Sequence, residues 1–193
     1  YVALNTILTD EQLPEAVSLA WDLYGAGADA LIIQDMGLLM EELPPIPLHA
    51  STQCHNDSNA KLRTLEALGM EQVVLPREVS TADLPSLLDG VGMRVESFVH
   101  GALCVSYSGR CFISEACRGR SANRGACAQY CRMSYDLEDA TGRKLLTGQH
   151  LLSLRDLNRT EIIEEMLDRG VSSLKIEGRL KDIDYVRNVT AHY

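Results

Sequence analysis

The sequence contains no long apolar run, no low-complexity tract and no segment of the kind that directs export. No apolar stretch in the 193 residues approaches the roughly 20 that a bilayer-spanning helix needs, so we expect no membrane span. The first residues lack a basic segment followed by an apolar one, which is the pattern of a signal peptide. We therefore expect a cytoplasmic protein with reduced thiols, because lasting disulfides are rare in reducing compartments.

Familiar catalytic and nucleotide-binding motifs are also missing. Neither an HExxH segment nor a GxSxG turn is present, so no motif supports a zinc peptidase or a serine hydrolase. No glycine-rich phosphate loop follows a predicted strand, which weakens the case for a dinucleotide-binding sheet. The net charge of −9 argues against a protein that coats nucleic acid without specificity.

The segments that are present alternate between strands and helices. Apolar residues make up 46% of the chain, which suits a single domain over residues 1–193 with a substantial core. The predicted strands are 1–6, 30–35, 47–52, 72–78, 94–99 and 172–178. The predicted helices are 9–28, 37–43, 58–69, 82–91, 160–170 and 182–193. This alternation predicts an α/β fold with a parallel sheet and right-handed crossovers.

Polar residues follow nearly every predicted strand, where a (β/α)8 barrel would place them on one rim. They are Asn5, Gln34, Asp35, His49, Gln53, Arg77, Glu78, Glu96, His100, Lys175 and Glu177. We therefore predict a TIM-type (β/α)8 barrel rather than a doubly wound sheet. About six βα units cannot close such a barrel, and the chain starts inside a strand without Met, so we expect an incomplete barrel that lacks the first two units.

Residues 101–135 are predicted to form a Cys/Arg-rich insertion after the strand at 94–99, and residues 135–150 a β-hairpin. Five of the six cysteines lie in the insertion, four of them with the spacing Cys104-x6-Cys111-x15-Cys127-x3-Cys131. Four thiolates suit a metal centre, and this irregular spacing favours an iron–sulfur cluster over zinc, whose structural sites usually pair cysteines two to four apart. Buried structural thiols remain an alternative, as does a catalytic thiol at Cys104 with His100 as its base.

Basic residues are concentrated in the same insertion. Residues 104–132 contain five arginines and only one acidic residue, Glu115. The arginines are Arg110, Arg118, Arg120, Arg124 and Arg132. Such a patch on an acidic protein can bind a phosphate or one RNA loop, or it can be a solvated loop.

The last predicted strand carries two charged residues on one face. Alternation in SLKIE places Leu174 and Ile176 toward the helices, so Lys175 and Glu177 point into the barrel. A buried Lys or Glu needs a partner or a ligand. These two residues can form structural ion pairs with Arg77 or Glu96, or they can bind a substrate.

ESFVHGALCVSYSGRCFIS, residues 96–114, resembles the signature of peptidase family U32. NTILTDEQL, DALIIQDMG, LHASTQC, GRSANRG, HLLSLRDL and SLKIEGRLKDIDYVRNVTAHY resemble one branch of it, which hydroxylates cytidine in large-subunit ribosomal RNA. The related transfer-RNA uridine hydroxylases share the cysteine signature but are less similar around GRSANRG. The resemblance covers essentially all 193 residues.

The resemblance implies a (β/α)8 barrel, a [4Fe-4S] cluster and prephenate as co-substrate. Carried over by position, the cluster ligands are Cys104, Cys111, Cys127 and Cys131, with Cys54 and Cys117 outside the pattern. We expect catalytic roles for His49, His100, Lys175 and Glu177, and substrate contacts from Gln53, Arg77 and Arg179. In this hypothesis Lys175 and Arg179 bind the carboxylates of the acid, Glu177 orients them, and the arginines of the insertion meet RNA phosphates.

Three other functions fit parts of the same pattern. A collagenase-like peptidase would use Cys104 and His100, and a transfer-RNA uridine hydroxylase would use the same cluster. A zinc-stapled RNA-binding module would use the cysteines only to fold the insertion. No pattern in the sequence predicts an oligomeric state.

Overall fold

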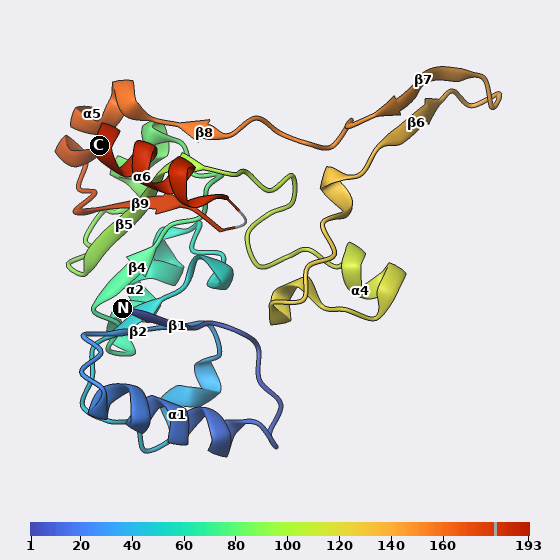
Figure 1. Ribbon diagram of the computed structural model, residues 1–193. Coiled ribbons are helices and arrows are strands. Elements are labelled where there is room, and N and C mark those ends of the chain that lie inside the picture. Colours follow the sequence, from blue (N-terminus) through green and yellow to red (C-terminus); the bar gives the residue numbers. More distant parts are fainter. Residues whose placement is uncertain (180) are drawn as a thin grey trace.

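Figure 1 shows the computed structural model of the chain, which describes residues 1–179 and 181–193. Six parallel strands form one sheet in the order β1-β2-β3-β4-β5-β9. They are Val2–Leu4 (β1), Leu31–Ile33 (β2), Leu48–Ala50 (β3), Gln72–Val74 (β4), Arg94–Gly101 (β5) and Ser173–Glu177 (β9). The short strand β8, Leu157–Asn158, pairs antiparallel with the end of β5. The predicted α/β fold with a parallel sheet is confirmed.

Helices cover one face of this sheet and form the core with it. They include Leu13–Gly25 (α1), Asn59–Ala67 (α2), Leu84–Leu87 (α3) and Ile163–Asp168 (α5). The buried side chains of the strands on that face are apolar: Leu31, Ile33, Ala50, Val73, Val95 and Val99. The opposite face carries polar side chains, because alternate residues of a strand point to opposite faces. That polar face and the carboxyl ends of the strands contain the predicted site residues that lie outside the insertion.

The sheet is open within the described residues. Its edges are β1 and β9, which do not pair with each other, so these residues form no closed barrel. The predicted helix at 37–43 is instead a 3-10 turn, Met36–Met40. Asp35 caps the start of this turn, because its Oδ1 accepts a hydrogen bond from Gly37 N at 2.8 Å. The predicted helix at 82–91 is shorter than expected, because Gly90 has a φ of +66° and leaves the helical region.

The segment between β5 and β8, which comprises the insertion and the hairpin, contains little regular structure. Its elements are the helix Ile113–Arg118 (α4), the strands Tyr135–Glu138 (β6) and Lys144–Gln149 (β7), and the 3-10 turns Ala122–Arg124 and Tyr130–Arg132. In Figure 1, α4 lies beside the sheet, whereas β6 and β7 form a hairpin that extends away from it. The last helix, α6, spans Ile183–His192. No helix in the described part of the chain is both long and apolar enough to cross a bilayer.

Candidate functional site

The insertion and the carboxyl ends of the strands enclose a cavity of about 160 Å³. Four cysteines of the insertion line it, together with three polar residues that follow strands: Cys104, Cys111, Cys127, Cys131, Gln53, Arg77 and Arg179. These seven residues include all the predicted cluster ligands and the predicted substrate contacts Gln53, Arg77 and Arg179, but not Lys175. We call this space the cysteine cavity.

The two remaining cysteines lie elsewhere. Cys117 is exposed on α4 and does not line the cysteine cavity. Cys54 lies behind the cavity wall, where its Sγ is 3.6 Å from the carbonyl oxygens of both Ile33 and Gln34. Burial raises the pKa of the Cys54 thiol to about 11, so this thiol stays protonated at neutral pH.

The charges of the cavity cysteines influence one another. Burial raises the pKa of the Cys131 thiol, and thiolates at Cys104 and Cys127 raise it further, whereas Arg132 lowers it. A bound metal ion or cluster would lower the pKa of these thiols instead, because it stabilises thiolates. Within the described residues, however, no three His, Cys, Asp or Glu side chains are close enough to hold a single metal ion. All four thiols nevertheless line one cavity.

Arg77 is fixed in the cavity wall by two neighbours. Its Nη2 is 2.7 Å from Glu177 Oε2, and its guanidinium carbon lies 3.8 Å from the centre of the Phe98 ring. The other oxygen of Glu177 accepts a hydrogen bond from Arg179 N at 2.8 Å. Glu177 therefore orients the Arg77 side chain and binds the backbone of Arg179.

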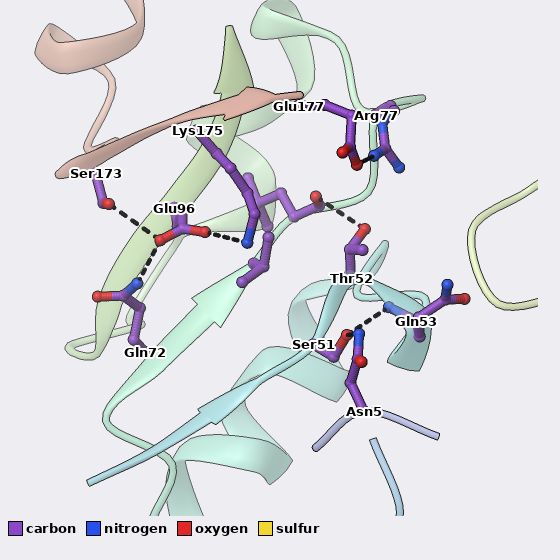
Figure 2. A network of polar contacts seen from close by, with 12 residues as sticks. Asn5, Ser51, Thr52, Gln53, Gln72, Arg77, Glu96, Ser173, Lys175 and Glu177 are labelled. Atoms are coloured by element: carbon purple, nitrogen blue, oxygen red, sulfur yellow. Dashed lines mark hydrogen bonds and ion pairs between the residues drawn. The ribbon is translucent and has the colours of Figure 1, made fainter. Parts of the chain in front are cut away.

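Glu96 is the centre of a second network on the polar face of the sheet. Its Oε1 is 2.8 Å from Lys175 Nζ, and its Oε2 accepts hydrogen bonds from Gln72 Nε2 at 2.8 Å and from Ser173 Oγ at 3.1 Å. Figure 2 shows these side chains converging on the carboxylate. Lys175 thus forms the structural ion pair considered from the sequence, and it does not line the cysteine cavity.

Gln53 is positioned by the turn that follows β3. Figure 2 shows Ser51 next to Asn5 and Gln53: Ser51 Oγ accepts hydrogen bonds from Asn5 Nδ2 and from Gln53 N, both at 3.1 Å. The 3-10 turn Thr52–Cys54 then carries Gln53 to the cavity.

The two histidines predicted to be catalytic lie outside the cysteine cavity. His49 is completely buried beside the Tyr1 ring, and neither of its ring nitrogens has a hydrogen-bond partner among the described residues. Burial lowers the pKa of His49, so its ring is neutral at pH 7. His100 contacts the C-terminal segment, with its Nδ1 3.1 Å from the Tyr193 hydroxyl. The structure places neither ring beside the four cysteines.

The five arginines of the insertion divide into two groups. The first group binds within the protein. Arg118 donates to the Tyr130 hydroxyl, and Arg124 donates to Gln12 Oε1. Arg132 donates to Ser153 Oγ and to the carbonyl oxygens of Leu103 and Leu154. Arg110 and Arg120 are exposed, and their guanidinium groups make no recorded hydrogen bond or ion pair with the described residues. These two are the arginines of the insertion that are open to an external phosphate.

Sequence reasoning missed three residues that shape the site. Asn123 and Tyr130 line the cysteine cavity, and the position of Tyr130 next to Cys131 was the available signal. Arg159 donates to four acceptors around the base of the site: Ser97 Oγ and the carbonyl oxygens of Phe98, Arg77 and Val79. No sequence motif marks Arg159, because its partners are backbone groups on distant segments.

Gly109 brings the insertion against the cavity wall, and its replacement by alanine is expected to open the cavity. A Cβ at this position would lie 2.0 Å from the Gln53 carbonyl oxygen, and the backbone has a φ of +71°. We expect Gly109→Ala to lower the free energy of unfolding by about 2–4 kcal/mol and to make Cys104 and Cys111 react faster with a thiol reagent.

Gly119→Ala is the matched control for this measurement. Gly119 lies in the same insertion with a φ of +62°, but a Cβ there meets nothing within 4 Å. This variant is expected to show only the conformational cost, about 1 kcal/mol. Equal effects of the two substitutions would contradict a tight contact between Gly109 and Gln53.

Known proteins similar to this chain match it along its whole length. It is 50% identical over 193 residues to the 23S rRNA 5-hydroxycytidine C2501 synthase of Escherichia coli (strain K12), covering 100% of this chain and 30% of that protein. It is 34% identical over 203 residues to tRNA hydroxylation protein P1 of Bacillus subtilis (strain 168), covering 100% and 48%. It is also 34% identical over 208 residues to a collagenase of Porphyromonas gingivalis (strain ATCC BAA-308 / W83), covering 100% and 50%. The chain spans half or less of each of these proteins.

The family comparison agrees with the resemblance found in the sequence. The profile described as Peptidase family U32 matches residues 1–193, which is the whole chain. The motif at 96–114, which contains the first two cavity cysteines, lies inside this match. The chain belongs to peptidase family U32.

Proposed function

We propose that this chain is part of an RNA hydroxylase that adds a hydroxyl group to a cytidine of large-subunit ribosomal RNA. The observation that carries the proposal is the cysteine cavity, where four thiols and two arginines meet. The 50% identity to a ribosomal RNA 5-hydroxycytidine synthase supports the choice of substrate. Such a substrate would place the reaction in the cytoplasm.

A [4Fe-4S] cluster is the cofactor that we propose for the cavity. Its ligands would be Cys104, Cys111, Cys127 and Cys131, and Cys117 would have no part in it. Each cysteine of such a cluster binds a different iron atom, so the sulfur atoms are spaced more widely than around one zinc ion. The irregular spacing of the four cysteines in the sequence supports the cluster over zinc, whose structural sites usually pair cysteines two to four apart. A bound cluster would supply one-electron transfer at the cavity.

Arg77 and Arg179 are the residues that we propose to bind a small dicarboxylic acid such as prephenate. A guanidinium binds a carboxylate through two parallel hydrogen bonds, and both arginines line the cavity beside the cysteines. Glu177 holds the Arg77 guanidinium at 2.7 Å and accepts a hydrogen bond from the backbone N of Arg179. The second cationic contact to the acid is therefore proposed to be Arg77 and not Lys175, because the ammonium group of Lys175 pairs with Glu96.

The RNA is proposed to approach from the side of the insertion. Arg110 and Arg120 would contact its phosphates, and the target base would leave its stack to reach the cavity, at a cost of a few kcal/mol. We also propose that the six-stranded sheet is part of a (β/α)8 barrel, since the site lies at the carboxyl ends of parallel strands, where barrel enzymes carry their active sites.

Deletion of the gene is expected to abolish one modified nucleoside in the ribosomal RNA. Nucleosides from digested large-subunit RNA and transfer RNA of the deletion and parent strains are quantified by mass spectrometry. We expect 5-hydroxycytidine to be lost from the ribosomal RNA and to return when the gene is supplied again. Loss of 5-hydroxyuridine from transfer RNA instead would favour the alternative suggested by the Bacillus subtilis relative. No change in either nucleoside would refute the proposal.

The collagenase-like alternative has less support. It needs a base beside Cys104, and the nearest candidate in the sequence, His100, hydrogen-bonds with Tyr193 and does not line the cysteine cavity.

A further inference from the structure

A second cavity, of about 490 Å³, lies on the other side of the segment that carries Cys104 and Cys111. This volume is within the range of small-ligand sites. Tyr107 lines both cavities, so the two spaces are neighbours. None of the residues predicted to act in hydroxylation lines this second cavity.

The wall of the second cavity is acidic and contains a buried histidine. Asp57, Glu78 and Asp83 contribute carboxylates, and the His55 side chain is 7% exposed. His55 Nε2 is 3.0 Å from Asp57 Oδ2, whereas its Nδ1 is 3.5 Å from Glu78 Oε1 and has no hydrogen-bond partner among the described residues. When Nε2 carries the proton that bonds Asp57, Nδ1 is an acceptor without a donor that faces Glu78 Oε1.

Tyr107 provides an open aromatic surface at the edge of the same cavity. Its side chain is 65% exposed, and its ring contacts His55 edge-on at 5.6 Å between centroids. The segment below it is anchored, because Ser108 N and Oγ bond to Glu78 at 2.7 and 3.1 Å. Exposed rings on anchored loops are the surfaces on which single-stranded RNA bases stack.

We propose that this cavity binds an unpaired, amino-bearing base of the RNA substrate, next to the base that is hydroxylated. The inference rests on the proposed function, which supplies the RNA. The base would stack on Tyr107, and its amino group would donate to the carboxylates of Asp57 and Glu78, as cytosine N4 donates to acidic residues elsewhere. Uracil would bind less well, because it presents a carbonyl oxygen at that position. Phosphates would be repelled by the carboxylates and would lie toward Arg110, which is exposed three residues from Tyr107.

Fluorescence anisotropy with labelled eight-nucleotide oligocytidine and oligouridine tests this proposal. We expect the wild-type chain to bind oligocytidine about tenfold more tightly than oligouridine. Tyr107→Leu should weaken binding of both by about tenfold, because it removes the stacking surface. Asp57→Asn should reduce the preference for cytidine, since the amide also presents a donor. Phe112→Leu is the control, because Phe112 is an equally exposed ring on the same insertion that lines neither cavity, and it should change nothing.

The outcomes separate this inference from the proposed function. Equal binding of the two RNAs, or affinities unchanged by Tyr107→Leu, would overturn the base-binding cavity, while loss of 5-hydroxycytidine in the deletion strain would still support the hydroxylase. Displacement of both RNAs by spermidine without any base preference would also overturn it, in favour of a polyamine site. The inference is supported if Asp57→Asn reduces the cytidine preference, Tyr107→Leu weakens binding of both RNAs, and Phe112→Leu does neither.

Discussion

Replacing Cys131 by serine is expected to remove iron and hydroxylation activity together. Cys131 lines the cysteine cavity together with Cys104, Cys111 and Cys127. Serine is a poor ligand for iron, and a cluster with three cysteines is readily lost. We expect the iron content of protein purified without oxygen to fall from about four atoms per chain to less than about one, with loss of the brown colour.

Cys117→Ser is the control for this experiment. Cys117 is also a cysteine of the insertion, but it is exposed and does not line the cavity. This variant should keep its iron, its colour and its activity. Wild-type protein that contains about one zinc and no iron would contradict the cluster, and equal iron loss in both variants would contradict the assignment of the four ligands.

Replacing Lys175 by methionine is expected to destabilise the fold rather than to remove a substrate contact. The substitution leaves the Glu96 carboxylate, which is 6% exposed, without its cation and with only neutral donors from Gln72 and Ser173. Breaking a buried ion pair costs about 3–5 kcal/mol, and partial exposure of Lys175 reduces this to about 2–3 kcal/mol. Urea denaturation measures the loss.

A double variant distinguishes the structural role from a ligand role. Adding Glu96→Gln to Lys175→Met removes the unpaired charge, so the double variant should regain part of the lost stability. A Lys175→Met protein with wild-type stability but no hydroxylation would instead support the role in substrate binding that the sequence suggested.

The sequence predicted the strands well, because their signals are local. Each strand contains apolar residues, which alternate with polar ones in β9, and all six lie where the pattern places them. The helices at 37–43 and 82–91 were overestimated, because their extent depends on the Asp35 contact to Gly37 N and on the conformation of Gly90. Neither is visible as a periodicity of apolar residues.

Which polar residues share a site was predicted only in part. Position after a strand correctly selected Gln53 and Arg77, both of which reach the cysteine cavity. The same rule selected His49 and His100, but one lies buried within the polar face of the sheet and the other faces the C-terminal segment. Position at a strand end places a side chain at the carboxyl edge of the sheet. It does not determine which other segments pack against that side chain.

The sequence by itself determined the fold class, the family and the residue types of the site, because strand propensity, apolar periodicity and the spacing of cysteines are properties of neighbouring residues. The tertiary structure decided the pairing: Lys175 with Glu96, Arg77 with Glu177, and four thiols around one cavity with Cys117 outside it. It also revealed the second cavity between the segments of His55, Glu78 and Tyr107. These contacts join residues up to 100 positions apart, and such contacts depend on how the sheet and the insertion pack, which no local pattern encodes.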